Sequence, residues 1–156
     1  MADATVHSIN VSDGGVPKRP RRSAWVGTNG VEGDRQRNLR VHGGPNRAVA
    51  IYSLDLIESL RAEGHPIAPG TIGENLTLAG IDWSLMVPGA RMAIGEVELE
   101  LTAYAHPCNQ IVDSFADGNS TRVSQKVQPG WSRLYAKVLH EGRIATGDSV
   151  SFARVS

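Results

Sequence analysis

The sequence predicts a mainly β domain with a few short helices. Glycine occurs 17 times and proline 8 times in the 156 residues, so turn-forming residues interrupt the chain at short intervals. The segments between these turns are short and mostly alternate apolar with polar residues, a pattern typical of half-buried strands. A chain of this length is sized for one domain, so we expect residues 1–156 to form a single domain.

The first half of the chain is predicted to contain two strands and one helix. Residues 5–11 form the first strand, and residues 12–46 follow as a long stretch that is rich in glycine, proline and arginine but has little periodicity. Residues 47–52 are expected to form a strand that runs directly into a helix. Ser53 is the expected N-cap of that helix, and Gly64 is expected to end it.

The second half is predicted to contain four strands and two short helices. The clearest strand covers residues 96–102, where aliphatic residues alternate with glutamates. We therefore interpret these glutamates as a solvated face and not as a catalytic cluster. The remaining expected strands and helices are listed by range: strands over 75–79, 134–140 and 149–155, and helices over 109–116 and 121–126.

The charge balance argues against nucleic acid and membrane partners. Lys plus Arg and Asp plus Glu number 16 each, so the formal net charge is zero. The basic run over residues 18–22 is interpreted as a solvated loop. Residues 1–13 lack the apolar run of a signal peptide, and no stretch approaches the roughly 18 apolar residues of a membrane span. We expect a cytoplasmic protein.

Cys108 is the only cysteine, and it is the candidate catalytic residue and metal ligand. A lone thiol cannot form an internal disulfide or a multi-cysteine metal site. Its remaining roles are packing, nucleophilic or sulfur chemistry, and ligation of one soft metal. Pro107 ends the preceding strand region, and a helix that begins near Asn109 would direct N–H groups toward the sulfur and favour the thiolate.

A second motif, His42-Gly43-Gly44 followed by Arg47, is a candidate anion cradle. Glycines let backbone N–H groups come close to a ligand, and the planar fork of an arginine suits phosphate or carboxylate. An ordinary glycine turn with a surface histidine and arginine is the alternative. Lys18 could add a further positive charge to the cradle.

Glu74 and Asn75 form a third candidate, because they enter a predicted strand directly after Gly73. Their polar side chains could fix the hydrogen-bond pattern of a ligand. Alternatively, they satisfy buried backbone groups.

Taken in order, these segments resemble the MOSC family, the domain also found at the C-terminus of molybdenum cofactor sulfurases. The resemblance implies a β-barrel-like fold in which a lone cysteine carries the chemistry, and the length is similar to that of the stand-alone bacterial type. The matching segments are Gly15-Val16-Pro17-Lys18, Gly33-Asp34, His42-Gly43-Gly44 with Arg47-Ala48-Val49, residues 69–77, Pro107-Cys108, and residues 135–139 with Gly147-Asp148.

One position departs from the family pattern. Many relatives carry an arginine three residues before the cysteine, where this chain has Ala105. That arginine could hold an anionic ligand. Four basic residues could replace it, namely Arg91, Arg122, Lys126 and Arg133, and the sequence does not choose among them.

The resemblance implies a protein that binds the molybdenum cofactor (molybdopterin), with Cys108 at the metal and the cradle residues, Glu74 and Asn75 at the rest of the cofactor. Some family members reduce N-hydroxylated small molecules with electrons from external redox proteins. Two alternatives stay open. Cys108 could carry a persulfide received from a cysteine desulfurase, whose pyridoxal phosphate would belong to that partner alone. The protein could also be a non-catalytic anion-binding module.

Overall fold

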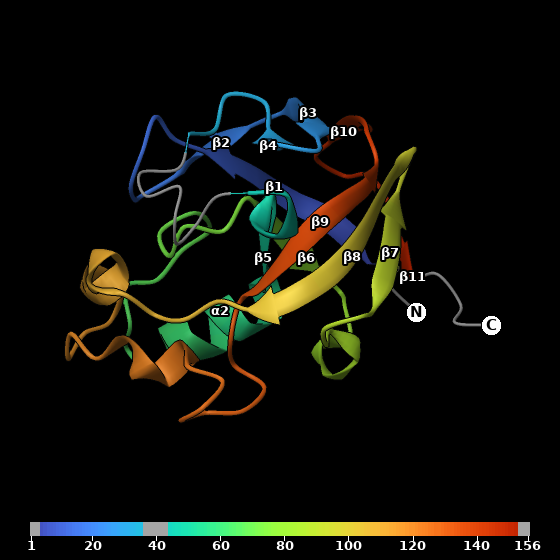
Figure 1. Ribbon diagram of the computed structural model, residues 1–156. Coiled ribbons are helices and arrows are strands. Elements are labelled where there is room, and N and C mark those ends of the chain that lie inside the picture. The colour runs from blue at the N-terminus through green and yellow to red at the C-terminus, as the bar shows by residue number, and fades with distance from the viewer. Residues whose placement is uncertain (1–3, 36–43, 153–156) are drawn as a thin grey trace.

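The computed structural model describes residues 4–35 and 44–152, which fold into two antiparallel-rich sheets with short helical segments (Figure 1). The larger sheet has the strand order β11-β7-β8-β9-β5-β6-β1-β2, and the smaller has the order β10-β3-β4. The strands of the larger sheet are β1 (Thr5–Val11), β2 (Arg19–Arg21), β5 (Val49–Ser53), β6 (Leu76–Ala79), β7 (Arg91–Ile94), β8 (Val97–Tyr104), β9 (Leu134–His140) and β11 (Val150–Phe152). Those of the smaller sheet are β3 (Ser23–Gly27), β4 (Gly30–Val31) and β10 (Gly142–Ala145). The helical segments are α2 (Leu54–Ala62) and the 3-10 turns η1 (Pro45–Arg47), η2 (Trp83–Leu85), η3 (Asn109–Ser114) and η4 (Ser120–Val123).

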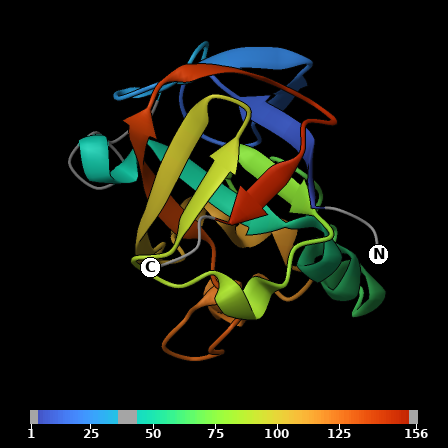
Figure 2. The ribbon, with the colours of Figure 1, turned by 90° about the vertical axis from the view of Figure 1, so that its right-hand side faces the viewer.

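The prediction of a mainly β fold with a few short helices is confirmed. The larger sheet curls so that the start of β1 meets the chain that leads into β11 (Figure 2). Thr5 and Ser149 form an antiparallel bridge there. The Val150 N–H also donates to the Ala4 carbonyl at 2.9 Å. This contact gives the sheet a barrel-like form.

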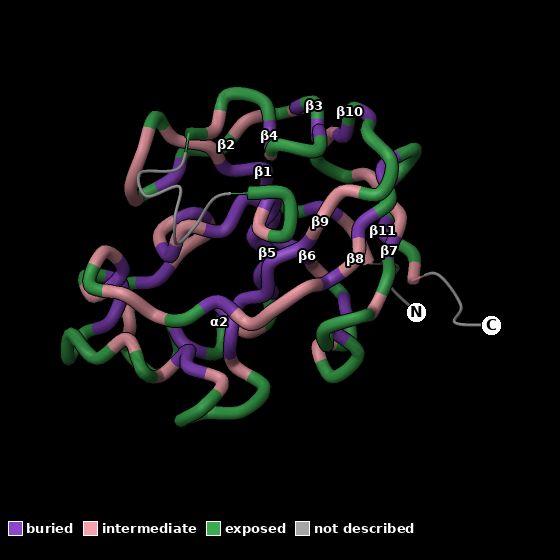
Figure 3. Tube along the Cα trace, viewed as in Figure 1, coloured by how far each residue is buried: buried purple, intermediate pink, exposed green. Residues whose placement is uncertain are grey.

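The main core lies inside the curled sheet, where the strands are buried along most of their length (Figure 3). Strand β8 shows how the sequence produces it. Val97, Leu99 and Leu101 are buried in the core, while Glu96 and Glu98 are exposed. The alternation along this strand therefore separates its two faces as predicted.

Helix α2 begins and ends where its sequence signals lie. The Ser53 hydroxyl accepts a hydrogen bond from the Leu56 N–H at 3.2 Å, which caps the first turn. Gly64 follows the helix with φ +101°, a conformation that favours glycine. Ile57 and Leu60 pack into a second core cluster, which also contains residues of η3 and η4 and thereby fixes these turns beside α2.

Several short elements were not predicted. Strands β2, β3 and β4 all fall within residues 12–46, and β7 and β10 were also missed. Strand β2 reads Arg19-Pro20-Arg21 and has no apolar alternation; it exists because it pairs with β1 at the edge of the sheet, where a proline is tolerated. The two predicted helices after Cys108 are short 3-10 turns. In the described part of the chain, no helix has the length and apolar character needed to cross a membrane.

Candidate functional site

Cys108 lies where the chain leaves the sheet. The β8–β9 ladder continues to the Ala105 N–H, which donates to the Arg133 carbonyl at 2.9 Å, and Pro107 then takes the chain away from the sheet. Cys108 is extended, with φ −134° and ψ 173°, and it precedes η3. Its side chain does not cap this turn, and the residue is partly exposed. The thiol is therefore available to a ligand.

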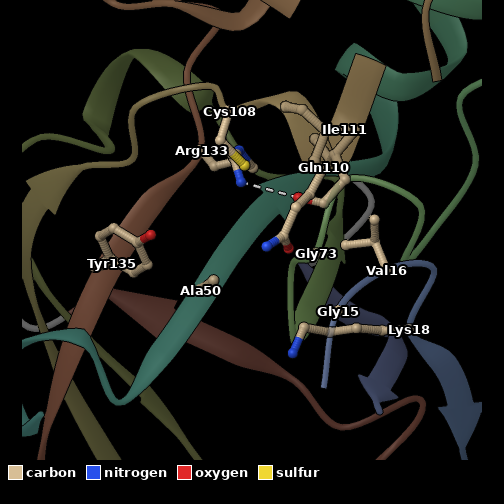
Figure 4. A pocket seen from close by; sticks show the side chains of 11 residues that line it. Gly15, Val16, Lys18, Ala50, Gly73, Cys108, Gln110, Ile111, Arg133 and Tyr135 are labelled. Carbon is tan, nitrogen blue, oxygen red and sulfur yellow. Dashed lines mark hydrogen bonds between the residues drawn. The ribbon is translucent and has the colours of Figure 1, made fainter. Parts of the chain in front are cut away.

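A small pocket opens beside this thiol (Figure 4). Its volume is about 50 Å³, room for a few water-sized atoms. Five chain segments that are distant in sequence supply the lining residues: Gly15, Val16, Lys18, Ala50, Ile72, Gly73, Cys108, Gln110, Ile111, Arg133 and Tyr135. The pocket thus admits a small group or one end of a larger ligand.

Arg133 is one of two buried cations that line this pocket, with only 4% of its surface exposed. Its Nη1 donates to the Ile72 carbonyl at 2.9 Å, and its Nη2 donates to the His106 carbonyl at 3.1 Å. These bonds tie the start of β9 to two other walls of the pocket. Within the described residues, Arg133 forms no ion pair and its Nε has no hydrogen-bond partner.

The other three basic residues that could replace the missing arginine do not line the pocket. Arg122 pairs with Glu63 at 2.7 Å, and Arg91 pairs with Glu100 at 2.9 Å. Lys126 is exposed. Of the four candidates, Arg133 is the one that lines the same pocket as Cys108.

Lys18 also lines the pocket, but its charge is already paired. Its Nζ lies 2.6 Å from Asp34 Oδ1, and both side chains are buried. Asp34 additionally accepts hydrogen bonds from the Ser12 N–H and from Asn75 Nδ2, each at 2.9 Å. Lys18 therefore belongs to a buried polar network at the pocket floor, and most of its charge is compensated there.

Glu74 and Asn75 are fully buried and are not among the residues that line the pocket. Asn75 Oδ1 accepts from the Ala50 N–H at 3.0 Å, and Asn75 Nδ2 donates to the Asn10 carbonyl at 3.2 Å. Burial raises the pKa of the Glu74 carboxyl to about 7, against the opposing effect of its hydrogen bonds. In this structure, Asn75 satisfies buried backbone groups, which is the alternative that the sequence left open.

Among the described residues of the predicted anion cradle, Lys18 lines the pocket, whereas Gly44 and Arg47 do not. His42 and Gly43 lie outside the described residues. Gly44 is exposed and has φ +93°. The Arg47 guanidinium carbon lies 5.5 Å from the centre of the Tyr135 ring, and Tyr135 itself lines the pocket. Arg47 thus contacts a lining residue but does not line the pocket itself.

Sequence reasoning did not single out Tyr135 or Gln110 as site residues. Burial raises the pKa of the Tyr135 hydroxyl, and the nearby Arg133 and Arg47 charges oppose that rise. The hydroxyl is thus protonated at neutral pH and can donate a hydrogen bond. Its position within the family-like segment 135–139 was the available signal. Gln110 follows the cysteine by two residues and had no comparable signal.

Together, these residues form a site that suits a compact anion beside a soft sulfur atom. It combines a partly exposed thiol, a buried guanidinium and a phenol. The described residues contain no group of three or more His, Cys, Asp or Glu side chains that could hold a metal ion. A metal at Cys108 would therefore have to bring most of its ligands with it.

Comparison with known proteins identifies the family. The profile of the MOSC domain matches residues 38–151. The chain is 31% identical to the uncharacterised protein YflK of Bacillus subtilis over 135 residues, which cover 85% of this chain and 60% of YflK. It is also 31% identical over 128 residues to a protein named "Reductase" from Gibberella moniliformis, with 78% of this chain and 22% of that protein covered.

The fold is also similar to that of a solved structure. The crystal structure of YiiM from Geobacillus stearothermophilus superposes with a TM-score of 0.71 at 23% identity, over 97% of this chain and 75% of that one. The chain thus spans only part of the length of its relatives. Because the family profile covers most of the sequence, this chain belongs to the MOSC domain family.

Proposed function

We propose that this protein binds the molybdenum cofactor at Cys108 and uses it to reduce N-hydroxylated small molecules. The observation that carries the proposal is the only thiol of the chain, partly exposed in a pocket that also holds a buried arginine. The MOSC family is generally associated with this cofactor. The name of the Gibberella relative adds support for a reductive role.

The residues present fit the metal end of the cofactor. A thiolate is a soft ligand and suits a molybdenum atom that the sulfurs of a pterin already hold. Since the described residues supply no metal cluster of their own, a metal with its own ligands is the kind that Cys108 could bind. A cavity of about 50 Å³ accepts only a few atoms, so the fit applies to the metal end and not to the pterin.

The bound cofactor would supply a centre that accepts and donates two electrons. In the overall reaction, the N–O bond of an N-hydroxyl group breaks, two electrons and two protons enter, and the oxygen leaves as water. The electrons would come from an external redox partner. Cys108 would anchor the metal, Arg133 would hold an anionic oxygen, and the Tyr135 hydroxyl would donate a hydrogen bond within the pocket. We place this activity in the cytoplasm, where a single thiol stays reduced.

The test is the molybdenum content of protein purified from a host that makes the cofactor. We expect molybdenum in the wild type and in the surface control Lys126→Met, its loss in Cys108→Ala, and a reduced but measurable content in Cys108→Ser, whose hydroxyl oxygen can still bind a metal. Equal molybdenum in wild type and Cys108→Ala would contradict the proposed role of the thiol. Absence of molybdenum from all variants, with cyanide-labile sulfur on the wild type alone, would replace the proposal with the persulfide carrier served by a cysteine desulfurase.

A further inference from the structure

Arg133 carries a buried positive charge that forms no ion pair within the described residues, although the buried Glu74 carboxyl lies close enough to interact with it electrostatically. The two buried cations of the pocket differ in this respect. Lys18 has an ion pair with Asp34 at 2.6 Å, whereas Arg133 has only the carbonyl oxygens of Ile72 and His106. Neutral carbonyls orient a guanidinium but do not neutralise it. An unpaired buried charge is costly, and an anion that enters the pocket would remove that cost.

The hydrogen bonds of Arg133 leave one side of its fork free. Nη1 and Nη2 are each fixed by one carbonyl, while Nε is buried and has no partner among the described residues. A guanidinium binds an oxyanion best through two parallel N–H groups. Nε is closed to solvent in this structure, so an oxyanion would pair with Nε and the second hydrogen of a neighbouring nitrogen after a small shift of the atoms that cover Nε. Because the two carbonyls hold the side chain in place, little conformational entropy would be lost on binding.

The surroundings of this free edge favour a small anion. Arg133 and Cys108 both line the pocket, and Figure 4 shows the Tyr135 hydroxyl directed toward its interior. No aspartate or glutamate is among the described residues that line the pocket. Its volume of about 50 Å³ limits the part of a ligand that lies inside it to a few heavy atoms.

We propose that Arg133 forms an oxyanion subsite, which holds one tetrahedral oxyanion of phosphate size beside the thiol of Cys108. The oxyanion can be a free inorganic ion or the terminal group of a larger molecule, since both present the same oxygens to the guanidinium. The subsite deepens the proposed function and rests on it for its biological role. The binding itself requires no cofactor, so the two can be tested separately.

The test measures how fast iodoacetamide alkylates Cys108 in cofactor-free protein, with titration calorimetry as a second measure of binding. Phosphate, molybdate and glycerol phosphate are the probes, and chloride at matched ionic strength is the control. We expect each probe that binds to slow alkylation saturably in the wild type and in Arg91→Met, a control whose arginine lies outside the pocket. Stronger protection by glycerol phosphate than by phosphate would identify the terminal group of a larger molecule as the natural occupant, and the reverse would identify a free ion.

Two variants of Arg133 separate the contribution of the planar guanidinium from that of the positive charge. We expect Arg133→Met to weaken binding about tenfold or more, and Arg133→Lys to weaken it less because it keeps the charge but loses the fork. Should Arg133→Met fail to fold, the wild type against chloride and Arg133→Lys decide the question. Equal slowing by chloride and phosphate, or unchanged phosphate affinity in an Arg133 variant, would overturn the subsite. Loss of molybdenum binding with intact phosphate binding would refute the proposed function alone.

Discussion

Replacing Asn75 with alanine should destabilise the fold without removing a direct ligand contact. The side chain is fully buried and makes three hydrogen bonds, to the Ala50 N–H, the Asn10 carbonyl and the Asp34 carboxylate. At about 1 kcal/mol for each neutral bond, and somewhat more for the bond to a carboxylate, the loss amounts to roughly 3 to 4 kcal/mol. The Ala50 N–H would also be left buried without its acceptor.

Urea unfolding monitored by tryptophan fluorescence measures this loss as a lower midpoint at unchanged slope. The exposed residue Asn46 offers a matched control, because Asn46→Ala removes the same amide from the surface and should change stability by less than about 0.5 kcal/mol. A loss below about 1 kcal/mol in Asn75→Ala would refute this reasoning. So would lost phosphate binding at unchanged stability, since it would make Asn75 a ligand contact.

Three further predictions follow from single residues. Ser53→Ala removes the cap of α2 and should cost about 1 kcal/mol in urea unfolding, and an unchanged midpoint would contradict the assigned cap. The Glu74 pKa is raised from 4.5 to about 7, so its contribution to stability is greatest below about pH 4.5 and is lost as the pH rises through about 7. Glu74→Gln should therefore remove a decline of up to roughly 3 kcal/mol between about pH 5 and about pH 8, and an unchanged pH profile would contradict the assignment. Gly73 has φ +84°, and an added Cβ would lie 3.2 Å from Val16 Cγ1. Gly73→Ala should therefore destabilise the fold by about 1 kcal/mol and, because Gly73 lines the pocket, slow the alkylation of Cys108. Unchanged stability would show that the turn tolerates a side chain.

The parts of the fold that the sequence predicted are those with local causes. Strand β8 followed from the alternation of Val97, Leu99 and Leu101 with glutamates, and α2 followed from its cap at Ser53 and its stop at Gly64. Strands β2 and β3 depend instead on pairing with other segments: Pro20 of β2 lies opposite Asn10 of β1, and Trp25 of β3 lies opposite Arg143 of β10. Such pairing is not encoded in the local pattern of strands that contain only three and five residues.

The residues of the candidate site also differ in whether the sequence alone could identify them. Cys108 could be selected because it is the only thiol in the chain. Arg133 could be named only as one of four basic residues, since its place depends on the β8–β9 register and on a carbonyl at Ile72. The sequence left Asn75 open between ligand contact and backbone satisfaction. Its contacts with Ala50 and residues of β1 come from the fold, and no local pattern contains them.

X-ray absorption at the molybdenum edge tests the central claim most directly, because it reports the atoms bonded to the metal. Wild-type protein loaded with the cofactor should show one more sulfur neighbour at molybdenum than the Cys108→Ser variant loaded in the same way. An identical sulfur count in the two proteins would mean that the Cys108 thiol does not bind the metal, and the proposed role of this pocket would be wrong.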